Sequence, residues 1–315
     1  MSDVAVATAF GGPEVLSVVD EPVTDPEPSE VRIAVRAAGV NPIDYKVYSG
    51  LMGADPSVLP MRLGMEAAGV VTAVGVDAVG PAGPIAVGDE VIGYRLTGAY
   101  AAELVAAATE FVPKPAELDW NQAAGLLLTG GTAVHTLTAT NVGAGDTVLI
   151  HGASGGVGVM AVQLAVLRGA RVIATASPAR HDFLRELGAE SVAYGDGLAH
   201  RVRALAPDGI DAALDLIGTD EAVDVSLELV ADRSRIATIA AFGRAAQDGI
   251  QLLGGGPGSD PGTEIRNASR MELVRFVQQG KLRVFVAAAF PLADVADAHR
   301  AIMTGHTSGK IVLVP

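Results

Sequence analysis

A glycine-rich turn between an apolar strand and an apolar helix is the feature that most limits how this chain can fold. Residues 147–153 form an apolar run, residues 151–158 are HGASGGVG, and residues 157–167 have the length and apolar character of a buried helix. Glycines let the backbone turn tightly, and the free N–H groups at the helix start, helped by the helix dipole, bind a pyrophosphate. Ser154 stands at the second glycine position of G-x-G-x-x-G, so a plain structural turn remains the alternative.

Strands and helices continue to alternate after this turn. Strand-like runs cover residues 171–176, 191–194, 210–217 and 235–240, and a helix is predicted over residues 178–187. Buried strands separated by crossover helices build a parallel, doubly wound sheet, which binds ligands beyond the carboxyl ends of its strands. The sequence therefore predicts a Rossmann α/β domain with a dinucleotide at this edge of the sheet.

The end of the second strand indicates which dinucleotide binds. A site for NAD carries Asp or Glu about 20 residues after the glycines, whereas residues 175–180 (TASPAR) offer the Ser177 hydroxyl and the Arg180 guanidinium. A guanidinium binds phosphate, which a carboxylate would repel, so the pattern favours NADPH over NADH. Arg180 as a solvated helix residue, and Tyr194 as a core aromatic, remain the alternatives. The predicted cofactor residues of this domain are Ser154, Gly155, Gly156, Val157, Ser177, Arg180, Tyr194, Ile217, Ala240 and Phe242.

The first 118 residues have a different pattern. Short strand-like runs such as 31–37 and 67–76 are divided by turns at Gly64 and in the Gly/Pro cluster over 80–88. This spacing predicts a closed or strongly bent antiparallel sheet. Residues 119–122 (DWNQ) have the form of a capping box, which predicts a helix start.

The last part of the chain is predicted to leave the Rossmann pattern. The Gly/Pro-rich stretch over 247–263 predicts a mobile loop, residues 271–279 a helix, and residues 282–290 and 310–314 two strands. Neither strand resembles another βαβ unit, so we expect this tail to return to the first domain. The predicted domains are residues 1–118, 119–264 and 265–315.

Composition excludes several classes of function. A formal net charge of -14 argues against nucleic acid as a partner, although a locally basic pocket still suits a phosphorylated cofactor. The chain has no cysteine, which excludes disulfides, thiolate zinc sites and cysteine nucleophiles and fits a cytoplasmic location. The N-terminus lacks a signal-peptide pattern, and the apolar stretch over 156–167 is shorter than the roughly 20 residues that span a bilayer, so no membrane partner is expected.

Four segments in order along the chain resemble one family. Residues 151–158 resemble the cofactor turn of quinone oxidoreductases, and residues 39–44 (GVNPID) the segment that opens their active site. Residues 64–71 (GMEAAGVV) resemble the G-H-E-x-x-G-x-V segment of medium-chain alcohol dehydrogenases, and residues 308–313 (SGKIVL) their closing strand. The chain thus resembles the zinc-independent quinone oxidoreductases of the medium-chain dehydrogenase/reductase superfamily. This implies a GroES-like catalytic domain, a Rossmann domain, a homodimer formed through the Rossmann sheets, and Lys310 as a cofactor contact.

The departures from the zinc-dependent members affect the chemistry. Asn41 and Met65 stand where those enzymes have the Cys and His that bind the metal. Catalytic zinc needs about three protein ligands, so no metal is predicted, and Glu66 is predicted to be a structural hydrogen-bond partner. Without a Lewis acid, the site suits acceptors that take a hydride readily, namely quinones or activated α,β-unsaturated carbonyls.

Three residues are predicted to act in catalysis. Asn41 would donate or accept near the nicotinamide carboxamide or the substrate oxygen, with a role as a turn residue as the alternative. Lys46 would steady an oxyanion, with a solvated surface position as the alternative. By resemblance Thr129 would lie near the nicotinamide, while Tyr45 and Tyr48 would line the substrate pocket. An enoyl or 2-alkenal reductase, or an NADPH-sensing protein without turnover, remain alternative functions, and oxidation of NADPH by an acceptor would separate a sensor from an enzyme.

Overall fold

The computed structural model describes residues 1–305 and 307–315. It divides into two units, the first formed by Met1–Leu128 with Arg270–Pro315 and the second by Thr129–Ser269. The sequence had placed the divisions after residues 118 and 264, so the short helix α2 (Trp120–Ala123) lies in the first unit instead of the second. Its predicted capping box is present, because Asp119 and Gln122 exchange hydrogen bonds between side chains and backbone N–H groups.

Unit 1 is built on antiparallel strands, as its alternating pattern predicts. The long strand β3 pairs with β5, β9 and β18, and its register shifts between Arg32 and Ile33 and again between Val35 and Ala37. The main sheet has the order β10-β8-β5-β3-β18-β17, and a second sheet has the order β2-β1-β4. The strands of the main sheet are β3 (Glu30–Val40), β5 (Glu66–Val74), β8 (Glu90–Tyr94), β9 (Glu103–Ala107), β10 (Phe111–Pro113), β17 (Val286–Pro291) and β18 (Lys310–Val314); the smaller sheets contain β1 (Ser2–Ala7), β2 (Leu16–Glu21), β4 (Met61–Arg62), β6 (Val79–Gly80) and β7 (Gly83–Pro84).

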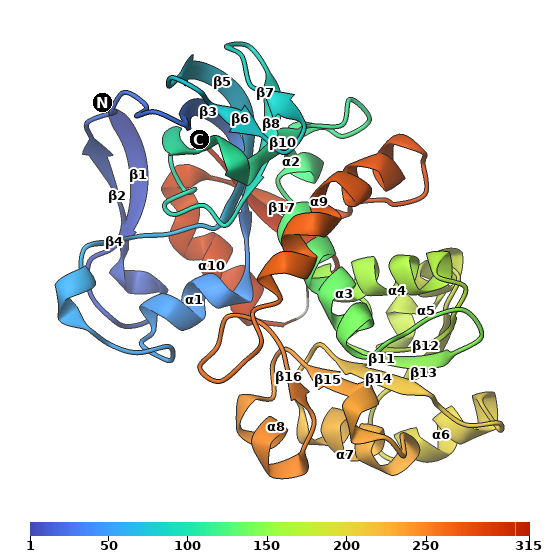
Figure 1. The fold of residues 1–315 in the computed structure, drawn as a ribbon. Coiled ribbons are helices and arrows are strands. Elements are labelled where there is room, and N and C mark those ends of the chain that lie inside the picture. The colour runs from blue at the N-terminus through green and yellow to red at the C-terminus, as the bar shows by residue number, and fades with distance from the viewer. Residues whose placement is uncertain (306) are drawn as a thin grey trace. The chain divides into compact units, whose positions relative to one another are not determined.

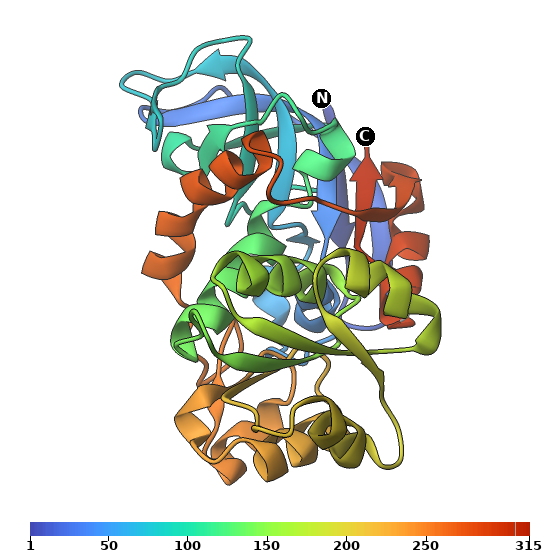
Figure 2. The same ribbon diagram turned by 90° about the vertical axis from the view of Figure 1, so that its right-hand side faces the viewer.

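The C-terminal segment returns to this unit, as expected, but one detail of the prediction is wrong. β18 pairs antiparallel with β3 and lies beside it, although the two are far apart in sequence (Figure 2). β17 runs parallel to β18, and helix α10 (Val295–Met303) connects the two, so they do form a β-α-β unit. The hydrophobic pattern of the sequence does not reveal this unit, because β17 alternates between half-buried and exposed residues. It lacks the continuous apolar run of a strand that is covered on both faces.

Unit 2 is the predicted doubly wound α/β domain. Its six strands are all parallel, in the order β13-β12-β11-β14-β15-β16. In Figure 1 the helices α6, α7 and α8 lie on one face of this sheet, and α3, α4 and α5 lie on the other. The strands are β11 (Thr147–His151), β12 (Arg171–Ala176), β13 (Glu190–Ala193), β14 (Ala212–Asp215), β15 (Ile236–Thr238) and β16 (Gln251–Leu252), and the helices are α3 (Leu127–Ala139), α4 (Gly156–Leu167), α5 (His181–Glu186), α6 (Leu198–Leu205), α7 (Asp220–Leu229) and α8 (Phe242–Asp248).

The Gly/Pro-rich segment predicted as a loop is only partly one. It contains the end of α8 and strand β16, and a closed loop over residues 253–262 follows. Helix α9 (Thr263–Gln278) begins well before the predicted helix over residues 271–279. Among the described residues, none of the helices combines the length and the apolar character that crossing a bilayer requires.

Candidate functional site

The glycine turn has the geometry that a pyrophosphate requires. Gly152 adopts a φ of 70°, which favours glycine, and Gly155 is the N-cap of α4. A Cβ on Gly158 would lie 2.6 Å from the carbonyl carbon of Ala153, so only glycine lets α4 pack this closely on the turn. The N–H groups in the first turn of a helix have no acceptor within it. These N–H groups follow Ser154, at the end of β11, where an anion can accept hydrogen bonds from them.

The predicted cofactor residues of unit 2 all follow carboxyl ends of neighbouring parallel strands. Ser154 to Val157 come after β11, Ser177 and Arg180 after β12, and Tyr194 after β13. Ile217 follows β14, and Ala240 and Phe242 follow β15. Tyr194 and Ile217 are exposed, so Tyr194 is not the core aromatic that was the alternative. The sheet topology therefore brings this set to one edge.

A buried carboxylate that the sequence analysis missed organises part of this edge. Asp215, at the end of β14, accepts hydrogen bonds at Oδ1 from the backbone N–H groups of Ile217 and Gly218 and at Oδ2 from the hydroxyl of Thr238. The Thr238 hydroxyl oxygen in turn accepts from the backbone N–H of Ala240. Asp215 and Thr238 thus fix the turns that follow β14 and β15. An isolated Asp in the otherwise apolar run over residues 212–217 was the signal for it.

The end of β12 presents a cation to solvent. Ser177 is the N-cap of a short 3-10 helix over Pro178–Arg180, and the Arg180 side chain is exposed. No hydrogen bond or ion pair of its guanidinium occurs within the part of the chain that the structure describes. A guanidinium that is free of protein carboxylates can bind a phosphate with two parallel hydrogen bonds.

In unit 1 the structure brings Asn41 and Lys310 together around Glu66. The Lys310 ammonium donates to Asn41 Oδ1 and to Glu66 Oε1, each at 2.5 Å, and to the Val40 carbonyl at 3.3 Å. The Asn41 amide group donates to Glu66 Oε1 and to the carbonyl oxygen of Gly39, both at 3.1 Å. All three protons of Lys310 are therefore used inside this unit, and so are both amide protons of Asn41.

These contacts change two predicted roles. Lys310 is 3% exposed and its ammonium group is bonded to protein groups, which argues against the cofactor contact that the resemblance implies for it. Asn41 has no proton left to donate to a substrate oxygen and keeps only acceptor capacity on Oδ1. Glu66 is confirmed as a structural hydrogen-bond partner.

Helix α1 (Pro42–Tyr48) carries the other candidates of unit 1. Tyr48 is 1% exposed, and its hydroxyl is 3.1 Å from His299 Nδ1, so it belongs to the core and does not line a substrate pocket as predicted. Tyr45 is half-buried. Lys46 is half-buried too, and burial lowers the pKa of its ammonium group. Thr129, by contrast, is a buried residue of the first turn of α3.

The same arrangement of elements occurs in known proteins. Residues 27–158 match the alcohol dehydrogenase GroES-like domain, and residues 187–313 match the zinc-binding dehydrogenase family. A quinone oxidoreductase of Pseudomonas aeruginosa is 35% identical, with 98% of both chains covered. The chain belongs to the medium-chain dehydrogenase/reductase superfamily.

Two further members of this superfamily are informative. A chloroplastic NADPH-dependent alkenal/one oxidoreductase of Arabidopsis thaliana is 30% identical over 98% of this chain and 78% of its own length. The structure of the Escherichia coli quinone oxidoreductase complexed with NADPH superimposes with a TM-score of 0.86 at 27% identity, with 99% of this chain and 100% of the other covered.

The name of one matching family raises the question of zinc, and the residues here do not fit it. Within the described residues, no group of three His, Cys, Asp or Glu side chains lies close enough together to hold a metal ion. At the position of the metal-binding segment, Asn41 and Glu66 are occupied by the ammonium group of Lys310, and Met65 stands beside Glu66. A cation of the protein itself thus already neutralises the carboxylate.

Proposed function

We propose that this chain is an NADPH-dependent reductase that transfers a hydride to quinones without zinc. The observation that carries the proposal is the end of β12, where Ser177 and the exposed, unpaired Arg180 stand beside the glycine turn and no acidic residue is present. That combination suits the 2′-phosphate of NADPH. The quinone oxidoreductases among its relatives, one of them solved with NADPH, support the same cofactor and acceptor.

The roles of the residues follow from this cofactor. NADPH, when bound, supplies the hydride, and the protein supplies position and a dry pocket. The first turn of α4, after Gly155, would hold the pyrophosphate, and Arg180 would hold the 2′-phosphate. Lys46 would stabilise the oxyanion that develops on the acceptor. Thr129 would lie near the nicotinamide, and Tyr45 would contact the acceptor.

A second acceptor class is favoured by one relative. The Arabidopsis protein is named for alkenals and enones, and a hydride acceptor of this kind also develops an enolate oxyanion that Lys46 could steady. The two classes share the cofactor site and differ only in the shape of the acceptor pocket. Quinone reduction stays our first choice because the P. aeruginosa relative is the more similar.

Steady-state oxidation of NADPH and of NADH by the purified protein tests the proposal. The panel contains a benzoquinone, a naphthoquinone, a 2-alkenal and an enone, each with and without a metal chelator. We expect quinone turnover with NADPH preferred and no effect of the chelator. Alkenal turnover alone would move the assignment to the second class. Tight NADPH binding without turnover on any acceptor would favour the sensor.

Arg180→Ala isolates the cofactor assignment. Loss of charge-assisted hydrogen bonds to a phosphate costs about 1.5–3 kcal/mol, or about 10- to 100-fold in binding. We therefore expect the KM for NADPH to rise by about that factor while the KM for NADH stays unchanged. Arg185→Ala is the matched control, because Arg185 is an exposed arginine of α5 paired with Asp182. Equal rises for both cofactors would refute the 2′-phosphate role.

We also propose that the chain is a cytoplasmic homodimer. The resemblance implies a dimer formed through the Rossmann sheets, and β16 is the last strand in the order of the parallel sheet, where another strand could pair. Light scattering after gel filtration gives the mass in solution. A mass equal to one chain would refute the dimer.

A further inference from the structure

The buried carboxylate of Glu66 receives more hydrogen bonds than its ion pair alone requires. Its Oε1 accepts from Lys310 Nζ at 2.5 Å and from Asn41 Nδ2 at 3.1 Å. Its Oε2 accepts from the backbone N–H of Leu128 at 3.0 Å. Both oxygens thus face only donors. A carboxylate can accept at both positions, whereas the side-chain amide of glutamine can accept at only one.

This cluster lies at the start of two helices that carry candidates for the reaction. Asn41 precedes Pro42, the first residue of α1, and α1 carries Lys46. The backbone N–H of Asn41 donates to Asp44 Oδ2 at 2.8 Å, so its main chain is held as well as its side chain. Leu128 lies in the first turn of α3 and directly precedes Thr129. The cluster therefore fixes the first turns of both helices.

The backbone around the cluster is shaped to admit these side chains. A Cβ on Gly39 would collide with the Glu66 carboxylate and with the carbonyl oxygen of Ala124. A Cβ on Gly125 would lie 2.8 Å from Lys310 Cγ. Any residue other than glycine at these two positions would push Glu66 or Lys310 out of contact.

We propose that Glu66 and Lys310 are positioning residues for the proposed reaction. They hold the Asn41 amide, and through it the start of α1 with Lys46, and they hold the first turn of α3 with Thr129. Asn41 acts as part of this cluster and does not donate to a ligand. The inference rests on the proposed function, since the residues that the cluster positions are those assigned to the acceptor.

Glu66→Gln is the first test. The amide group that replaces one carboxylate oxygen must face either Lys310 and Asn41 or the Leu128 N–H, so one donor loses its acceptor. We expect kcat with a quinone to fall about tenfold or more, and the KM for NADPH to change less than twofold, because the cluster does not contact the residues proposed to bind the phosphates of the cofactor. Glu190→Gln is the control, since Glu190 forms an exposed ion pair with Arg171. Unchanged kcat in Glu66→Gln would overturn the proposal.

A double variant separates positioning from stability. Glu66→Gln combined with Lys310→Met removes both charges at once, so no unpaired charge stays buried and the fold is retained. We expect the melting temperature to recover relative to the single variants while kcat stays low. A double variant with wild-type kcat would show that the pair only stabilises the fold, and would overturn the positioning role.

Hydrogen exchange tests the cluster without turnover. Exchange at the Leu128 amide is expected to be slow in the native protein and to accelerate at least tenfold in Glu66→Gln. Unchanged exchange would overturn the contact on which the proposal depends. Native protein that oxidises NADPH with none of the acceptors in the panel would instead refute the proposed function, even if the exchange of Leu128 followed the expectation.

Discussion

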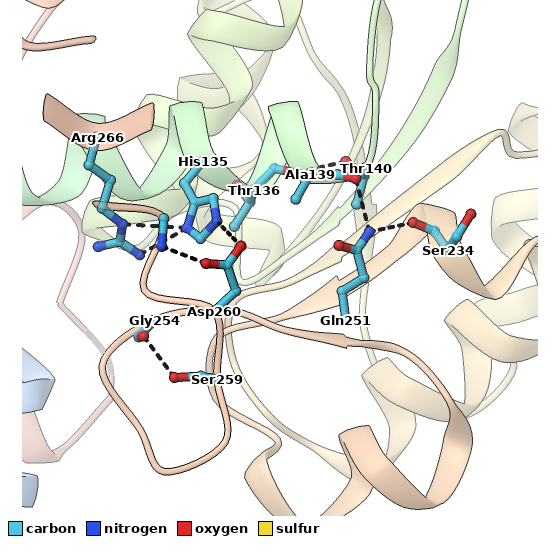
Figure 3. A network of polar contacts seen from close by, with 11 residues as sticks. His135, Thr136, Ala139, Thr140, Ser234, Gln251, Gly254, Ser259, Asp260 and Arg266 are labelled. Atoms are coloured by element: carbon cyan, nitrogen blue, oxygen red, sulfur yellow. Dashed lines mark hydrogen bonds and ion pairs between the residues drawn. The ribbon is translucent and has the colours of Figure 1, made fainter. Parts of the chain in front are cut away.

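In each unit a polar network joins segments that are far apart in sequence, and the two networks are built differently. In unit 1 the network is the ion pair of Glu66 and Lys310 with Asn41, and all three side chains are almost completely buried. In unit 2, Figure 3 shows His135 of α3 placed between Asp260 of the loop over 253–262 and Arg266 of α9. The first network encloses two charges, whereas the second reaches solvent through Asp260, whose side chain is 59% exposed.

The network of unit 2 depends on one tautomer of a neutral histidine. Asp260 Oδ2 is 3.2 Å from His135 Nε2 and can only accept, so Nε2 carries the proton. Nδ1 then accepts from the Arg266 guanidinium at 3.4 Å. Burial, and after it the charge of Arg266, lower the pKa of His135 and keep the ring neutral. Asp260 Oδ1 also accepts from the N–H of Gly262, which anchors the end of the loop.

The two networks differ in how much a broken contact costs. Water cannot replace a lost partner in the enclosed cluster of unit 1, while it can replace one at Asp260. Breaking the first network should therefore destabilise the whole fold, and breaking the second should free one loop.

Lys310→Met is expected to have the largest effect. It leaves the Glu66 carboxylate buried without its cation, which costs about 3–5 kcal/mol of the free energy of unfolding. Arg275→Met is the control, because Arg275 pairs with Glu272 on the surface, where a salt bridge contributes about 0–1 kcal/mol. Urea unfolding followed by circular dichroism measures both. Losses of similar size would mean that the enclosed pair is no more important than a surface pair.

The next largest effect is expected in mild acid, which should destabilise unit 2 more than unit 1. In unit 2, burial lowers the pKa of His151 to about 4 from 6.5, and the pKa of His135 is lowered too. A histidine with a lowered folded pKa contributes full stability above pH 6.5 and loses that contribution as the pH falls toward 4. At about 1.4 kcal/mol per pKa unit, the His151 contribution alone is about 3 kcal/mol.

In unit 1 two groups act in opposite directions over the same range. Burial lowers the pKa of His299 to about 4, but it raises the pKa of Asp44 from 3.8 to about 6. The raised carboxyl pKa contributes stability below pH 3.8 that is lost as the pH rises through 6, so acidification restores it. Hydrogen exchange at pH 7 and pH 4.5, corrected for intrinsic rates, is expected to show greater opening of unit 2. A greater opening of unit 1 would contradict these assignments.

The sequence predicted the α/β architecture of unit 2, and which residues follow the ends of its strands, because both depend on local patterns. An apolar strand, a glycine turn and an apolar helix stand next to one another over residues 147–167, and the five strands predicted between residues 147 and 240 all occur in the parallel sheet of unit 2, which has β16 as a sixth. Ser177 and Arg180 follow β12 for the same local reason.

The network of unit 1 could not be predicted, because its members meet only in the folded chain. Lys310 lies 244 positions after Glu66 in sequence, and each looked like a single residue beside an apolar strand. The role predicted for Tyr48 was wrong for a related reason, since the α1 segment alone does not show that its hydroxyl forms a hydrogen bond with His299 of α10. Contacts across long sequence separations are set by packing, which no window of sequence contains.

Asp260→Asn is expected to have the smallest effect on the whole fold and a distinct local one. The new amide can still accept from Gly262 at its oxygen, but its N–H groups then face His135 Nε2, which already carries a proton. If the ring changes tautomer, Nδ1–H faces the Arg266 guanidinium instead, so no arrangement satisfies both neighbours. We expect a loss of about 1 kcal/mol in the free energy of unfolding and faster hydrogen exchange confined to the loop over 253–262. Asp196→Asn, at an exposed position of unit 2, is the control. Faster exchange throughout unit 2 would show that Asp260 supports the domain in the way that Lys310 supports unit 1, and the contrast between the two networks would fail.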